Sequence, residues 1–148
     1  MMKATSLLAA MLIGASVFAQ TDITTTMTPE QAAQVIRLAV PFPELNPPGA
    51  PPPAPVDTNK VRQGFFGPLT RDIAYSGIFA IASLPPSVPV TPELLKRIEA
   101  QFHLQLNVWT EGEEYVVEAR LIDQAGTAQL KKRYRSPEGA LARTAHML

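Results

Sequence analysis

The sequence contains no cysteine, which excludes disulfide bonds and thiol chemistry. His103 and His146 are its only imidazoles, so we do not expect a zinc site built from Cys and His ligands. Neither sign of charge is in excess, because 13 Lys and Arg residues balance 13 Asp and Glu residues. A chain without net charge has no strong field that attracts nucleic acid or anionic lipid. We therefore expect no nucleic-acid partner, no metal and no other cofactor.

The signatures of common catalytic sites are also missing. There is no Gly-x-Ser-x-Gly elbow, and Gly64 and Gly67 lack the lysine of a phosphate-binding loop. The paired carboxylates Glu113–Glu114 lie in a predicted turn, where such charges are usually solvated. We place His103 at a helix C-terminus, which favours the imidazolium, and we assign no catalytic role to His146. The sequence predicts no catalytic residue and a protein that is not an enzyme, with a small hydrolase as the remote alternative.

The N-terminus carries an export pattern. Lys3 precedes the short apolar run SLLAAMLIGASVF, and Val17-Phe18-Ala19 supplies small residues at the positions that a signal peptidase reads. The apolar run is too short to cross a bilayer comfortably. We predict a cleaved signal peptide over residues 1–19, a periplasmic mature protein in a two-membrane bacterium, and no membrane span after cleavage. An uncleaved N-terminal anchor is the alternative.

Two polar or proline-rich segments flank the first predicted strand. Residues 20–34 are polar and rich in threonine, which predicts a flexible tail. Within an insertion over residues 43–57, six of the nine residues from Pro47 to Pro55 are proline. Proline stretches are extended and solvated because they lack backbone donors. We interpret the insertion as a stiff surface segment, and a ligand for a proline-recognition domain is the alternative.

The remaining pattern predicts alternating helices and strands over residues 35–135. Residues 35–42 (VIRLAVPF) are typical of a strand buried on both faces. An apolar stripe from Asn59 to Tyr75 predicts a helix that either kinks at Pro68 or begins there. Thr91-Pro92-Glu93 predicts the start of a second helix, whose buried stripe is Leu94, Leu95, Ile98 and Phe102.

The C-terminal third predicts two consecutive hairpins. The runs LQLNVWTE, EYVVEARLID and AQLKKRYR are separated by turns at Glu111-Gly112 and at Gln124-Ala125-Gly126. In the middle run, the apolar set Tyr115, Val117, Ala119 and Leu121 is expected to face the helices. Ser136-Pro137-Glu138 predicts a further helix, and we interpret residues 136–148 as the start of a truncated one. The fold class is α/β (α+β), with two layers: two helices packed on a mixed sheet of about five strands.

The hairpins also place opposite charges side by side. The basic residues Lys131, Lys132, Arg133 and Arg135 face the acidic residues Glu111, Glu113, Glu114 and Glu118. Cross-strand pairing is the simplest account, with an RNA or acidic partner as the alternative. Trp109, the only tryptophan, is expected to be buried and not to stack on a ligand.

A junction of unusual specificity lies at residues 72–81 (DIAYSGIFAI). Asp72 to Tyr75 are expected to close a helix, and Ser76-Gly77 to end it, because glycine adopts positive φ at little cost. Ile78 and Phe79 are then expected to return the chain to the core. Asp72, Ser76, Gly77 and Phe79 are therefore predicted to be structural residues.

Four stretches together resemble the N-terminal domain of the TolB family of the Tol-Pal system. They are IRLAVPF, RDIAYSGIFAI, YVVEARLIDQAGTAQLKKRYR and SPEGALARTAHML, and the resemblance covers roughly residues 35–148. The Asp72–Phe79 pattern is the most specific part. The resemblance implies a non-enzymatic role in which a C-terminal β-propeller binds the lipoprotein Pal and the mature N-terminal end binds the inner-membrane protein TolA.

Two departures from the family limit what the resemblance implies. The propeller is missing, so a Pal contact through it is doubtful. The segment that follows the signal peptide matches the TolA-binding segment in position only; its residues are Thr21, Asp22, Ile23, Thr24 and Thr25. We expect a periplasmic TolB-like N-terminal module that acts as an adaptor in envelope integrity and protein import, and that is a fragment of a longer reading frame. The alternative is a free-standing periplasmic ligand-binding or assembly accessory domain.

Overall fold

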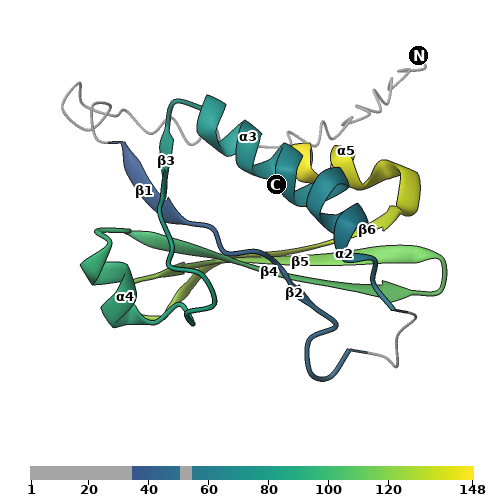
Figure 1. The fold of residues 1–148 in the computed structure, drawn as a ribbon, viewed down its shortest axis with the longest axis horizontal. Coiled ribbons are helices and arrows are strands. Elements are labelled where there is room, and N and C mark those ends of the chain that lie inside the picture. Colours follow the sequence, from purple (N-terminus) through teal and green to yellow (C-terminus); the bar gives the residue numbers. More distant parts are fainter. Residues whose placement is uncertain (1–34, 51–54) are drawn as a thin grey trace, which may run out of the picture.

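The structure, a computed structural model, describes residues 35–50 and 55–148. Its centre is a mixed six-stranded sheet (Figure 1), in which five strands follow the order β3-β1-β4-β5-β6 and β2 pairs with β4 beyond the end of β1. The strands are β1 (Ile36–Ala39), β2 (Glu44–Leu45), β3 (Phe79–Ala82), β4 (Phe102–Glu111), β5 (Glu114–Asp123) and β6 (Ala128–Pro137). The predicted α+β fold, with helices packed on a mixed sheet, is confirmed.

The first helical segment of the described residues runs without a break through three hydrogen-bonding patterns. It comprises α2 (Thr58–Val61), the π-helical turn η1 (Arg62–Phe66) and α3 (Gly67–Tyr75). Pro68, at the start of α3, cannot donate a backbone hydrogen bond. The π turn directly precedes it, and the amide of Gly67 bonds the carbonyl of Arg62, five residues back. The helix therefore accommodates Pro68 by changing its hydrogen-bond pattern, an outcome that neither predicted alternative included.

The two predicted hairpins are confirmed. Strands β4, β5 and β6 are antiparallel neighbours, and their turns contain Gly112 and Gly126, both with positive φ. The expected apolar side of β5 packs against the helices. The main core cluster joins Tyr115, Val117 and Ala119 of β5 to Val61, Phe65 and Leu69 of the first helical segment and to Leu141 and Ala145 of α5 (Leu141–Met147).

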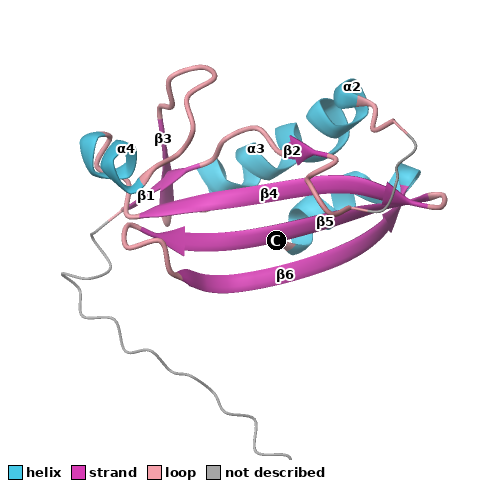
Figure 2. Ribbon diagram, turned by 90° about the horizontal axis from the view of Figure 1, so that it is seen from below, coloured by secondary structure: helices cyan, strands magenta, loops and turns pink. Residues whose placement is uncertain are grey.

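Helix α4 (Pro92–Arg97) covers the other face of the sheet at one end. Leu38 of β1 lines a small apolar cavity with Leu69 and Ile73 of α3. Ala39, the next residue, points to the opposite face, where it clusters with Ala82, Leu95 and Ala100. Figure 2 shows α4 at the end of the sheet, apart from α3 and α5. Leu38 and Ala39 are 3% and 0% exposed, so the second half of β1 is buried on both faces, as predicted, whereas Arg37 and Val35 are exposed.

Two helix boundaries were predicted wrongly. Thr91 caps α4 as expected, but the helix ends at Arg97, and Phe102 and His103 belong to β4. The backbone leaves the helix at Glu99, with φ of 56°, and the amide of Gln101 bonds the carbonyl of Arg37. Pairing with β1 therefore prevails over the helical spacing of the apolar residues.

The second wrong boundary lies near the C-terminus. Strand β6 extends to Pro137, and the 3₁₀ turn η2 (Glu138–Ala140) precedes α5. Ser136 is 0% exposed, and its hydroxyl donates to the carbonyl of Pro137 and caps no helix. A serine buried in the last strand cannot serve as a cap, because a cap must lie where the helix begins.

Candidate functional site

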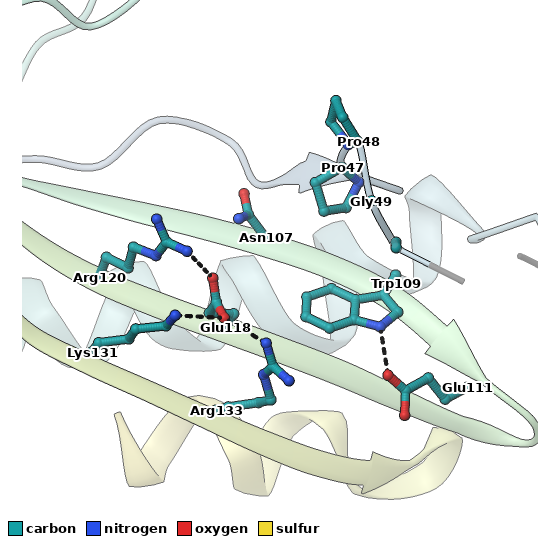
Figure 3. Close-up of a pocket in the computed structure, with 11 residues that line it drawn as sticks. Pro47, Pro48, Gly49, Asn107, Trp109, Glu111, Glu118, Arg120, Lys131 and Arg133 are labelled. Carbon is teal, nitrogen blue, oxygen red and sulfur yellow. Dashed lines mark hydrogen bonds and ion pairs between the residues drawn. The ribbon is translucent and has the colours of Figure 1, made fainter. Parts of the chain in front are cut away.

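The face of the sheet opposite α3 and α5 carries a buried carboxylate surrounded by cations (Figure 3). Glu118 lies on this face because Val117 and Ala119, its neighbours on β5, face the helices. Glu118 is 4% exposed, and it accepts hydrogen bonds from Arg120 at 2.7 Å and Arg133 at 2.9 Å. The ammonium of Lys131 lies 3.5 Å from the same carboxylate. We call Glu118, Arg120, Lys131 and Arg133 the charge cluster.

The antiparallel register explains why these side chains meet. Asn107 of β4, Glu118 of β5 and Arg133 of β6 are direct cross-strand partners. The predicted pairing of acidic and basic residues across the hairpins is therefore confirmed for Glu118. Burial raises the pKa of the Glu118 carboxyl, but the hydrogen bonds from Arg133 and Arg120 outweigh it and bring the pKa below its ordinary value. Glu118 is thus charged at neutral pH.

Trp109 lies beside the charge cluster and is held on two sides. Its indole N–H donates to Glu111 at 3.0 Å, and the guanidinium of Arg133 lies 5.3 Å from its ring centroid. The hydrogen bond from Trp109, together with Arg135, brings the pKa of Glu111 below its ordinary value despite some burial. Trp109 is 6% exposed, so its predicted burial is confirmed.

The proline-rich insertion forms one wall of a pocket above this face. Its first residues form β2, which pairs with β4, and the amide of Asn46 bonds the carbonyl of Val108 at 2.9 Å. Pro47 to Ala50 then lie over Trp109 and the charge cluster, and they enclose a pocket of about 310 Å³. The insertion was predicted to be only a surface spacer, whereas its described residues take part in the sheet and in this pocket.

The pocket contains polar atoms without partners. Among the described residues, Oδ1 of Asn107 and Nε of Arg120 are buried and make no hydrogen bond within the protein, and both residues line the pocket. An unpaired buried donor or acceptor costs about 1–3 kcal/mol. Neither atom has accessible surface in this arrangement, so an occupant of the pocket would reach them only if the side chains moved. Neither Asn107 nor the wall at Pro47 was identified from the sequence.

The predicted junction lies at the far end of α3. Gly77 has φ of +70°, the left-handed conformation expected from its position. The Ser76 hydroxyl donates to the carbonyl of Ile73 at 2.7 Å and accepts from the amides of Ile78 and Phe79. The Asp72 backbone carbonyl accepts from the Ser76 amide at 2.9 Å. These contacts turn the chain from α3 into β3.

The edge at β3 is more exposed than expected. Ile78 and Ile81 are 55% and 39% exposed, so the expectation that Ile78 enters the core is wrong. Among the described residues, β3 pairs only with β1, and its other edge has no strand partner. Val35 and Tyr75, which are 52% and 83% exposed, are also apolar, and Val35 directly precedes β1. We call Val35, Tyr75, Ile78 and Ile81 the edge patch.

The two histidines lie in different elements, His103 in β4 and His146 in α5. His103 lies in β4, where burial lowers its pKa, and the predicted helix-end position was wrong. His146 of α5 contacts the carboxylate of Asp72 in α3 and so links the two helices. Within residues 35–50 and 55–148, no three His, Asp or Glu side chains are placed to hold a metal ion. No helix in these ranges is both long and apolar enough to span a bilayer.

The remaining predicted features lie outside the described residues. These are the signal peptide at 1–19 and the tail at 20–34, with the partner-binding residues Thr21, Asp22, Ile23, Thr24 and Thr25. The proline run at 51–54 is also outside them. All of these remain predictions.

Comparison with known proteins identifies the fold. No protein-family model matches the sequence, and no curated protein matches it. Among solved structures, TolB from Acinetobacter baumannii superposes with a TM-score of 0.55 and 16% identity, over 77% of this chain and 26% of the TolB chain. The LpoB C-terminal domain from Escherichia coli superposes with a TM-score of 0.52 and 13% identity, over 68% of this chain and 82% of that domain.

The same domain of LpoB from Salmonella enterica gives a TM-score of 0.50 and 14% identity, over 70% of this chain and 83% of that domain. At these identities the comparisons establish a shared fold. The chain spans about a quarter of the length of the TolB chain that it matches. This fold therefore occurs both as a part of TolB and as the C-terminal domain of LpoB.

Proposed function

We propose that the chain is a non-enzymatic interaction module of the bacterial envelope that acts in the periplasm as the N-terminal domain of a TolB-like protein does. Its role is that of an adaptor in the Tol-Pal system, which serves envelope integrity and protein import. The observation that carries this proposal is the agreement between a family motif and a fold. The Asp72–Phe79 pattern resembles the TolB N-terminal domain, and the structure superposes on part of a TolB chain.

The position of the edge patch supports a role for the tail. In the resemblance, the partner-binding segment follows the signal peptide, at Thr21 to Thr25. This tail joins the domain at Val35, and the Ile36 amide bonds the carbonyl of Ile78 at 3.0 Å. The tail therefore meets the domain beside an open sheet edge and exposed apolar side chains. Such an edge can accept an added strand. We therefore assign the TolA contact to the tail, and we assign to the edge patch the role of holding the contacting segment against the domain.

Calorimetric titration of the mature chain with the C-terminal domain of the cognate TolA tests the proposal. We expect saturable binding by the chain that begins at Gln20, and at least a tenfold loss when residues 20–28 are removed. A Thr144→Ser variant, altered in the buried part of α5, serves as a control that retains binding. Equal binding with and without the tail would exclude its role, and no binding by the intact chain would exclude the adaptor function.

One observation favours the alternative of a free-standing ligand-binding or accessory domain. The LpoB structures show this fold as one domain, of which the match covers 82% and 83%. The described part of the chain also contains a pocket with unsatisfied polar atoms. The alternative requires that the isolated chain unfold in one cooperative transition without any added domain, so the absence of such a transition would exclude it.

A further inference from the structure

An apolar cavity lies between the sheet and the ends of α3 and α5, and from it we infer a binding site for the alkyl chain of a medium-chain carboxylate, such as octanoate. The cavity measures about 160 Å³. Figure 1 shows α3 and α5 side by side above the sheet. The cavity shares no residue with the edge patch or with the pocket at the charge cluster, and the site does not require the adaptor function.

The described residues that line this cavity are all apolar. Leu38, Leu69 and Ala119 form its buried part, and they are 3%, 2% and 4% exposed. The other lining residues are Ile73, Phe79, Leu104, Leu121, Leu130 and Leu148. An enclosed water molecule needs about two to four polar partners, and these side chains offer none. Water therefore gains little in the cavity, whereas an apolar occupant supplies the dispersion contacts that its walls lack.

The size and the opening of the cavity favour an alkyl chain. An apolar cavity of about 150 Å³ in another protein accommodates benzene, so this one has room for about six carbon atoms. Its walls are aliphatic except at Phe79. The cavity also reaches the surface, because Leu130 on its rim is 44% exposed. A chain can therefore enter end-on and leave a polar head group outside.

The strand register places a lysine beside the opening. Lys132 is the direct cross-strand partner of Ala119 and lies two residues from Leu130, so its side chain leaves β6 on the face that carries the cavity. It is exposed, and it makes no ion pair within the described part of the chain. Its neighbours on β6 point to the other face, where they belong to the charge cluster. An ammonium group without a partner beside an apolar opening favours a carboxylate as the head group.

Contacts at the end of α5 keep the opening in place before any ligand binds. The Tyr134 hydroxyl donates to the carbonyl of Met147 at 3.1 Å, and His146 contacts the carboxylate of Asp72 in α3. These contacts hold the segment that carries Leu148, a lining residue. The other walls come from α3 and from strands of the sheet, so little ordering is required on binding.

NMR titration can observe binding at the cavity itself. The methyl groups of Leu38, Leu69 and Ala119 report on its buried part, while the indole N–H of Trp109, which lines the other pocket, is the negative reporter. The probes are butanoate, hexanoate, octanoate and dodecanoate. We expect the affinity to rise about fourfold for each methylene up to octanoate, which corresponds to about 0.8 kcal/mol. It should level off at dodecanoate, because the additional methylenes remain outside.

Probes with other head groups test the role of Lys132. Octylammonium should bind at least about threefold more weakly than octanoate, because it places like charges together. Lys132→Gln should weaken octanoate about two- to fivefold, as expected for an exposed ion pair, and should leave the binding of 1-octanol unchanged. Lys96→Gln is the matched control, because it makes the same change at an exposed lysine of α4, on the other face of the sheet. It should bind octanoate like the unaltered chain.

A third variant reduces the volume of the cavity. Ala119→Val adds two carbon atoms to the buried wall, and it should weaken octanoate at least about fourfold by displacing one methylene or more. Thermal unfolding checks that this variant is folded, and Lys132→Gln tests the site at an exposed position without altering the core. The inference is overturned if octanoate shifts no cavity methyl signal or if affinity does not rise with chain length. It is also overturned if Ala119→Val binds octanoate like the unaltered chain, or if Lys132→Gln and Lys96→Gln bind it equally.

Discussion

The strongest test of the folded arrangement is the substitution Glu118→Gln. Glutamine has nearly the same shape but no charge, so the change removes the charge from two hydrogen bonds, at 2.7 and 2.9 Å, and from the Lys131 contact at 3.5 Å. A charge-assisted hydrogen bond is roughly twice as strong as a neutral one, which corresponds to a loss of about 1 kcal/mol for each bond. The half-exposed Lys131 adds at most about 0.5 kcal/mol.

The expected loss is therefore about 2 kcal/mol in the free energy of unfolding. For a domain of about 100 residues, this corresponds to a fall in Tm of about 8 °C, which calorimetry or circular dichroism would detect. Glu114→Gln is the matched control on the same strand and face. Its carboxylate lies 3.8 Å from Arg135 and is 48% exposed, so its loss should be below about 0.5 kcal/mol.

The pH dependence gives an independent test with a definite sign. The pKa of Glu118 in the folded protein lies below its ordinary value of 4.5. The stability that the ionised carboxylate contributes is therefore present above that ordinary value and is lost as the pH falls through the folded pKa. The difference between the unaltered chain and Glu118→Gln should shrink in acid. Equal stability of the two proteins at pH 7, or a difference that is unchanged at pH 3, would refute this account of the charge cluster.

Three further predictions concern backbone and turn positions. Gly77→Ala should lower stability by about 1–2 kcal/mol in denaturant unfolding, because φ of +70° disfavours a side chain, while Gly139→Ala, in open space without positive φ, should be nearly neutral. Gly64→Ala should stabilise the helix by about 0.5–1 kcal/mol, because alanine loses less backbone entropy than glycine and its Cβ would fit, 3.7 Å from the nearest side chain. Gly67→Ala should not stabilise it, because its Cβ would lie 3.2 Å from a carbonyl oxygen. An NMR titration should give the Asp123 carboxyl a pKa below its ordinary value of 3.8, because backbone amides in its turn donate to it. Protonation should loosen the turn as the pH falls through that lowered pKa.

Features that depend on neighbouring residues could be predicted from the sequence. The turns at Gly112 and Gly126 and the alternation along β5 involve residues within a few positions of one another. The same holds for Thr91, whose hydroxyl accepts from the amide of Leu94 at 3.2 Å. Tight turns also fix the antiparallel register, which is why the pairing of acidic and basic side chains around Glu118 could be predicted.

Features that depend on distant segments could not be predicted. The spacing of Ile98 and Phe102 fits a helix, but pairing of the chain with β1 ends that helix early. The wall at Pro47 depends on β2 lying parallel to β4, and no local pattern indicates this contact. Asn107 was missed for the same reason, since an asparagine in a strand shows its importance only when the segment above it is known.

The order of the strands also bears on how the sheet is completed. Strands β4 and β5 share ten register pairs across a short turn, whereas β1 meets β4 at only two, Leu38 with Phe102 and Ala39 with His103. Contacts between close neighbours form fastest, and contacts between remote segments wait for the chain to close a long loop. The strand that comes first among the described residues is thus positioned to join last. We expect β1 and β3 to detach together from the sheet of the native protein. In an amide hydrogen-exchange experiment, strands β4, β5 and β6 should therefore be protected from exchange for the longest time.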